Sequence, residues 1–107
     1  MDSILTSIKK LLGIASDYTH FDTDIIIQIN SALSALTQLG VGPLEGFEIT
    51  DASSTWGDFM DDPRLNLAKT YVYLRVRLAF DPPTSSALLE SYNRQLDELA
   101  WRLTVAQ

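Results

Sequence analysis

The stretch that decides the fold runs from Pro63 to Phe80, PRLNLAKTYVYLRVRLAF. On a helical wheel its polar residues form one narrow stripe, and nearly all the rest of the circumference is apolar. A helix of this kind is surrounded by other helices, so the segment predicts the centre of a helical bundle. Asp62 is expected to cap it, with Pro63 at the first helical position, where a missing N–H costs nothing. The prolines of Asp81-Pro82-Pro83 are expected to end it.

One residue of this segment, Arg75, falls opposite the polar stripe and among apolar neighbours. An unpaired buried charge is costly, so Arg75 is expected to have a carboxylate partner. Asp97, Glu90 and the acidic loop described below are the candidates for that partner. The pair is expected within the chain or, alternatively, between two subunits.

A first helix is predicted at about 3–12 from apolar residues that recur at helical spacing. Ser3 is its expected N-cap, and Gly13 follows its end in the way typical of helix C-termini. Lys9 and Lys10 are assigned to its solvent-facing side.

Two further helices are predicted at about 22–39 and 85–105, with Phe21 placed to pack back on the first of them as a hydrophobic staple. Together with the central helix at about 63–80 they give an all-α fold, a small bundle of four main helices. The length of 107 residues predicts a single domain.

The segment 40–62 has no helical periodicity and is predicted to be a long loop. Within it, residues 47–49 are expected to form a very short strand, and Thr55 to cap a single helical turn. Long irregular loops are often functional or mobile. Two interpretations are therefore kept: a solvated excursion pinned to its own subunit, or an arm that packs on another subunit. Its aromatic residues are the candidate contacts: Phe47, Trp56 and Phe59.

The net charge of −6 comes from this loop. Six of the 14 acidic residues lie in it with no basic residue, which leaves eight acids to face eight bases elsewhere. The acids of the loop are Glu45, Glu48, Asp51, Asp58, Asp61 and Asp62. This balance argues against a general nucleic-acid binder held by phosphate neutralisation.

Three apolar side chains are predicted to point away from their own helices. Ile27 lies on the polar side of its helix, which alone means little. Trp101 and Val105 lie one turn apart on the charged side of the last helix. Tryptophan is over-represented among interface anchors, so contact with another chain is one interpretation and packing within the subunit is the other.

No motif for catalysis, cofactor binding or metal binding is present in the sequence. There is no cysteine, and the single His20 is assigned to a solvated loop. Asp58, Asp61 and Asp62 are clustered, but such a cluster before a proline is more typical of a helix start than of a magnesium site. No run approaches the roughly 20 apolar residues that a membrane span requires. We therefore expect neither an enzyme nor a membrane protein.

Several blocks of the sequence resemble the small head–tail connector (adaptor) proteins of tailed bacteriophages and prophages. The most specific are QLGVGP and KTYVYLRVRLAFDPPTS, accompanied by SILTSIKKLLGI, the turn TWGDF and the closing ELAWRL. The order of predicted helices and loop also fits, and the resemblance covers nearly the whole chain.

The resemblance implies a structural protein of the virion that is present in the host cytoplasm during assembly. Such subunits form a homo-oligomeric ring beneath the portal protein, extend the DNA channel and provide a platform for stopper or tail-completion proteins. DNA passes through the channel without specific binding. The family has no catalytic residues to carry over. Interface roles are therefore predicted from this sequence alone, for Ile27, Phe47, Trp56, Phe59, Arg75, Trp101 and Val105.

Two alternatives stay open at this point. An acidic protein-binding module that mimics DNA would need carboxylates spaced over one face like phosphates. A metal-dependent enzyme would have to be built on the aspartates of the loop.

Overall fold

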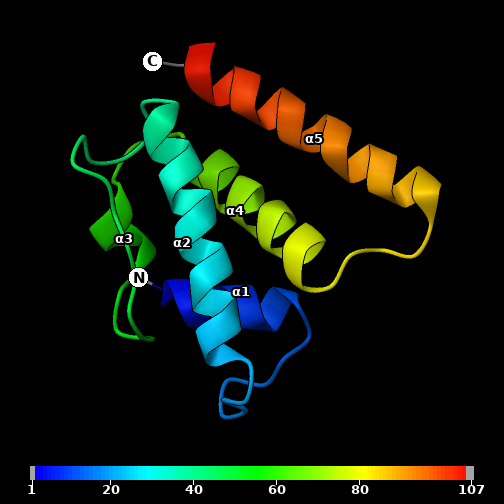
Figure 1. Cartoon of the computed structure of the whole chain (residues 1–107). Helices are drawn as coiled ribbons and strands as arrows, with labels where there is room; N and C mark the ends of the chain where they lie inside the picture. Colours follow the sequence, from blue (N-terminus) through cyan, green and yellow to red (C-terminus); the bar gives the residue numbers. More distant parts are fainter. Residues whose placement is uncertain (1, 106–107) are drawn as a thin grey trace.

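The computed structural model describes residues 2–105, which form five helices (Figure 1). The helices are α1 (Ile4–Leu11), α2 (Asp22–Gln38), α3 (Trp56–Phe59), α4 (Leu65–Phe80) and α5 (Ser86–Val105). No strand forms within residues 2–105, where the only strand-like pairing is an isolated bridge between Ser3 and Thr55. The prediction of an all-α bundle with four main helices and one short turn is confirmed.

Helix α4 lies at the centre, packed on one side by α2 and on another by α5 (Figure 1). Its residues Ala68, Val72 and Val76 are completely buried. The nearly continuous apolar surface of this segment is thereby covered from two directions, as its helical wheel predicted.

The predicted start of α4 is two residues too early, because Asp62 makes a tighter turn than a helix cap. Its Oδ1 accepts the backbone N–H of Arg64 at 2.7 Å, and its carboxylate binds the Arg64 guanidinium, with Nη2 to Oδ2 at 2.7 Å. An aspartate that bonds the N–H two residues ahead closes an Asx turn. Pro63 and Arg64 form this turn, and the helix begins at Leu65.

Phe21, the N-cap residue of α2, packs on the end of another helix. Its ring meets that of Phe80 edge to face, with centroids 5.3 Å apart. The contact joins the N-terminal end of α2 to the C-terminal end of α4, so it serves the tertiary packing of two helices.

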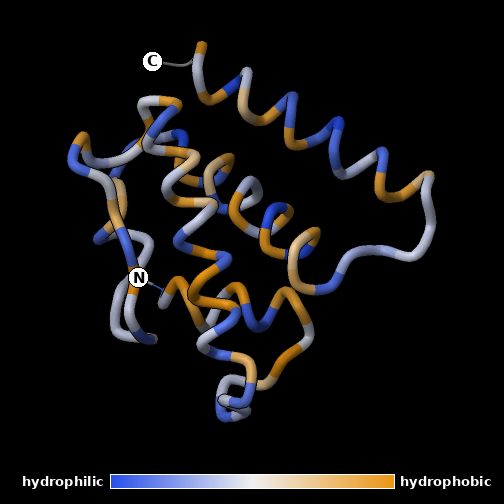
Figure 2. Tube along the Cα trace, in the orientation of Figure 1, coloured by the Kyte–Doolittle hydropathy of each residue, from blue (hydrophilic) through white to orange (hydrophobic). Residues whose placement is uncertain are grey.

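Helix α5 is held mainly by its C-terminal half. Leu99 and Leu103 are buried, whereas Leu88 and Leu89 in its first turns remain exposed. Figure 2 shows apolar residues recurring along the side of α5 that faces the bundle, and in Figure 1 the first turns of α5 stand apart from α4. The predicted apolar face is therefore present but covered over only part of its length.

Lys9, which was assigned to the solvent-facing side of the first helix, is buried, with 1% of its surface exposed. Its Nζ lies 2.7 Å from Asp22 Oδ1 and donates to the carbonyls of Tyr18 at 2.7 Å and Ser16 at 3.2 Å. Three oxygen partners replace the water that a buried ammonium loses. Lys9 thus binds α1, the connecting loop and the first residue of α2 together.

We predict that Lys9→Ala lowers the free energy of unfolding by about 3 kcal/mol, because it leaves a carboxylate and two carbonyls without their cation. Lys10→Ala is the matched control. That lysine is the next residue and is exposed, so its loss is expected to change stability by less than about 0.5 kcal/mol. Urea unfolding of both variants followed by circular dichroism measures the difference, and equal midpoints would contradict the structural role of Lys9.

Candidate assembly surfaces

The loop between α2 and α4 is attached to its own chain along most of its length. Trp56 and Phe59 are each 1% exposed, and Trp56 Nε1 donates to Ser7 Oγ at 2.8 Å. The half-buried ring of Phe47 packs on Phe59 with centroids 5.5 Å apart. The interface role predicted for Trp56 and Phe59 is therefore corrected: in this structure their side chains belong to the core. The interpretation of a pinned excursion describes the segment better than that of a free arm.

The predicted strand at residues 47–49 does not form. Instead, the side-chain amide of Asn30 on α2 forms hydrogen bonds with both the backbone N–H and the backbone carbonyl of Ile49. Asn30 Oδ1 accepts the Ile49 N–H at 2.8 Å, and Asn30 Nδ2 donates to the Ile49 carbonyl at 3.0 Å. An asparagine amide offers the same donor and acceptor as a neighbouring strand, so one side chain holds the extended segment and buries Ile49.

Three of the six loop acids are engaged locally. Asp58 completes the predicted cap of α3, since it accepts from Thr55 N at 2.9 Å while Thr55 Oγ1 accepts from Asp58 N. Hydrogen bonds from the side chain and backbone of Arg64 hold the pKa of Asp62 below its ordinary value, and those from Ser53 do the same for Asp51. These aspartates stabilise turns of the loop through local hydrogen bonds.

The remaining acids of the loop, Glu45, Glu48 and Asp61, are exposed. Within residues 2–105 no group of three or more acidic or histidine side chains is placed to hold a metal ion. Within the same residues, no helix is long and apolar enough to cross a membrane.

A tight turn at Pro43–Gly46 displays a residue that the sequence analysis did not single out. Leu44 is 94% exposed, the largest value among the exposed apolar side chains. The turn is closed by a hydrogen bond from Gly46 N to the Pro43 carbonyl at 3.0 Å. On its N-terminal side Gly42 has a φ of +88° and lies so close to Phe59 that a Cβ atom would meet the ring at 2.5 Å. The turn is therefore fixed on the core while its tip projects into solvent.

We predict that Gly42→Ala destabilises the protein by about 3 kcal/mol, because it combines an unfavourable positive φ with a clash against a buried ring. Gly13→Ala is the control that isolates the backbone contribution. Its φ is +82° but nothing lies within 4 Å of the added Cβ, so a loss of about 1 kcal/mol is expected. Thermal unfolding of both variants tests this, and equal losses would show that Phe59 yields without cost.

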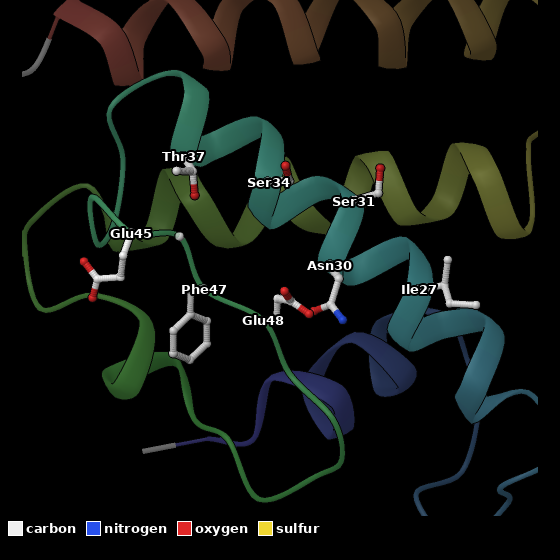
Figure 3. A pocket seen from close by; sticks show the side chains of 9 residues that line it. Ile27, Asn30, Ser31, Ser34, Thr37, Glu45, Phe47 and Glu48 are labelled. Carbon is white, nitrogen blue, oxygen red and sulfur yellow. The ribbon is translucent and has the colours of Figure 1, made fainter.

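The outer face of α2 carries Ile27, which is 57% exposed as predicted. It lies between two shallow hollows, the larger of about 700 Å³. Figure 3 shows the larger one between α2 and the segment 45–48, with Ile27 at one end and Glu45 at the other. Its lining residues are Ile27, Asn30, Ser31, Ser34, Thr37, Glu45, Gly46, Phe47 and Glu48. The smaller hollow is lined by Phe21, Asp24, Ile27, Gln28, Ala79, Phe80 and Asp81, so neither contains a basic residue.

Trp101 and Val105 point away from the bundle, with 65% and 57% of their surfaces exposed. The opposite side of the same helix is anchored by Leu99 and Leu103, both buried. The indole is thus presented on a helix whose position does not depend on it.

Arg75 is half-buried, and no carboxylate within residues 2–105 lies within 4.0 Å of it. The ion pair expected within the chain therefore does not form, and the alternative of a pair between two subunits stays a prediction. The Arg75 guanidinium lies over the ring of Tyr71 at 5.8 Å, and Nη1 is 3.3 Å from the Tyr71 hydroxyl. The expected partners Asp97 and Glu90 do not reach it. The aromatic ring and solvent take the place of the predicted ion pair.

Comparison with known proteins gives one match. The family described as phage connector protein matches residues 4–107, which is nearly the whole chain. The chain belongs to the phage connector protein family. No curated protein and no solved structure matches it.

Membership gives this connector protein a structural role of the phage connector type and makes it a virion component. The resemblance drawn from the sequence blocks is therefore confirmed at the level of the family. The exposed or partly exposed features of the described chain include the tip at Leu44, the hollows beside Ile27, the half-buried Arg75, and the outward face of α5 at Trp101.

Proposed function

We propose that this connector protein forms a homo-oligomeric ring beneath the portal protein at the head–tail junction. The ring extends the DNA channel and offers its other side to a stopper or tail-completion protein. The observation that carries the proposal is the outward display of Trp101 and Val105 on α5 in a chain that matches the connector family over nearly its whole length.

The exposure of Trp101 has an energetic consequence. Apolar surface removed from water contributes roughly 25 cal/mol per Å², and tryptophan offers about 200 Å² when fully covered. Because the structure of α5 is fixed by Leu99 and Leu103, covering the indole requires no rearrangement of its own turn. A neighbouring subunit or the portal is the partner that would cover it.

The charge of the protein fits passage of DNA better than capture of DNA. The net charge is −6, and exposed acids of the loop include Glu45, next to the tip at Leu44, as well as Glu48 and Asp61. Like charge suppresses tight phosphate contacts, so DNA can slide past a wall of this kind. The proposed role is structural, without catalytic residues or a cofactor.

We predict that Trp101→Ala weakens association with the ring neighbour or the portal by about tenfold or more, because it removes an apolar anchor from the interface. Helicity and the unfolding midpoint are expected to stay close to those of the unaltered protein, since the indole is mostly solvated in the single subunit. Sedimentation and light scattering, with and without portal, measure the association, and circular dichroism measures the fold.

Asn93→Ala is the matched control on the same helix, because Asn93 is exposed and polar. It is expected to change neither quantity. If Trp101→Ala reduced helicity and association in parallel, Trp101 would belong to the core. If the unaltered protein formed no oligomer even with portal, the ring itself would be refuted.

A further inference from the structure

We propose that the joint between ring neighbours seats the Pro43–Gly46 turn of one copy against Arg75 of the next. Glu45 pairs with the unpartnered guanidinium, and Leu44 packs on the apolar surface beside it. This inference rests on the proposed ring and names the two surfaces that meet in it.

The turn has the properties of a preformed anchor. Leu44 is almost entirely solvated, yet its backbone is held by the turn hydrogen bond, by Gly42 against Phe59 and by the buried Val41. A rigid apolar tip loses little conformational entropy when it binds, so more of its burial appears as affinity. Glu45 is exposed beside it and has no ion-pair partner within 4.0 Å among the described residues.

Arg75 has the complementary properties. A guanidinium carries five N–H donors, and in residues 2–105 the only hydrogen bond of Arg75 goes to the Tyr71 hydroxyl. Its unbonded nitrogens are not sealed in the core, because no nitrogen of Arg75 is among the buried side-chain atoms that lack a hydrogen bond in residues 2–105. The stacked ring of Tyr71 already orients the group, and Ala79, one turn further along α4, is exposed. The site therefore offers a positioned cation next to an uncovered apolar spot.

The two surfaces are different patches of the chain. Glu45 belongs to the turn that follows α2, whereas Arg75 lies in the C-terminal half of α4. A contact between two different patches on copies of one chain is heterologous, and such contacts generate rings when the rotation closes. Opposite charges on the two patches also fix the direction of assembly.

Charge reversal tests the ion pair. Glu45→Arg and Arg75→Glu are each expected to weaken self-association about tenfold or more, and the double variant is expected to recover most of the loss. Asp17→Arg and Lys10→Glu are controls that change the net charge by the same amounts at exposed sites outside both patches, and they should assemble normally. Sedimentation in the presence of portal provides the measurement, with circular dichroism to establish that each variant is folded.

Cysteine cross-linking tests the contact independently of Arg75, because the natural chain contains no cysteine. A mixture of Leu44→Cys and Ala79→Cys proteins is expected to give a disulfide-linked dimer on mild oxidation. Little cross-linking is expected from either variant alone, since two Cα atoms must come within about 7 Å of each other for the bond to form.

The possible outcomes separate this inference from the proposed function. Assembled rings without the mixed disulfide, or a double charge variant no better than the singles, would overturn the joint and leave the ring standing. Failure of the unaltered protein to assemble with portal would refute both. Recovery in the double variant together with the mixed disulfide would establish the joint.

Discussion

The structure depends on covering a central helix that is apolar over most of its circumference. Helix α4 cannot satisfy this requirement with one neighbour, so α2 packs on one side and α5 on another. The two coverings differ in extent: the buried face of α2 runs from Ile25 to Leu36, whereas α5 is buried only at Leu99 and Leu103. In the single subunit, α4 is therefore covered more completely on the side of α2 than on the side of α5, where apolar residues such as Leu88 and Leu89 remain exposed.

The irregular segment between α2 and α4 is held by a few specific contacts in place of regular hydrogen bonding. Asn30 supplies the partners that a strand would have given to Ile49, and Asp58 and Thr55 cap the single turn of α3. Trp56 and Phe59 then fix this segment in the core. A long loop attached in this way can present Leu44 and its acidic neighbours in one fixed arrangement.

The features that the sequence predicted correctly are local or periodic. Ser3 and Thr55 were recognised as caps because a cap is set within four residues, and the central helix was recognised because its pattern spans four turns. Lys9 was misassigned because its burial depends on the positions of the Ser16 and Tyr18 carbonyls in the connecting loop. A helical wheel shows only the residues of the helix itself, so it gives no information on those carbonyls. Arg75 was expected to find a carboxylate for sound energetic reasons, but an aromatic ring and partial solvation satisfied it in the subunit. Leu44 was passed over because only the shape of its turn distinguishes it from any other loop leucine.

The uncovered apolar residues lie on several separate elements, among them Leu11 on α1, Ile27 on α2, Leu44 on the turn after α2, and Trp101 on α5. One self-complementary dimer interface needs only a single patch, whereas a ring joined head to tail needs two different patches at every joint. A ring that also meets a portal on one side and a tail-completion protein on the other needs still more surface. A small chain has enough apolar surface for these contacts only if few of its apolar residues are needed for its own core. Here α5 contributes just two buried residues, Leu99 and Leu103, to the core. The incomplete burial of α5 is therefore consistent with a subunit whose remaining apolar surface is reserved for its neighbours.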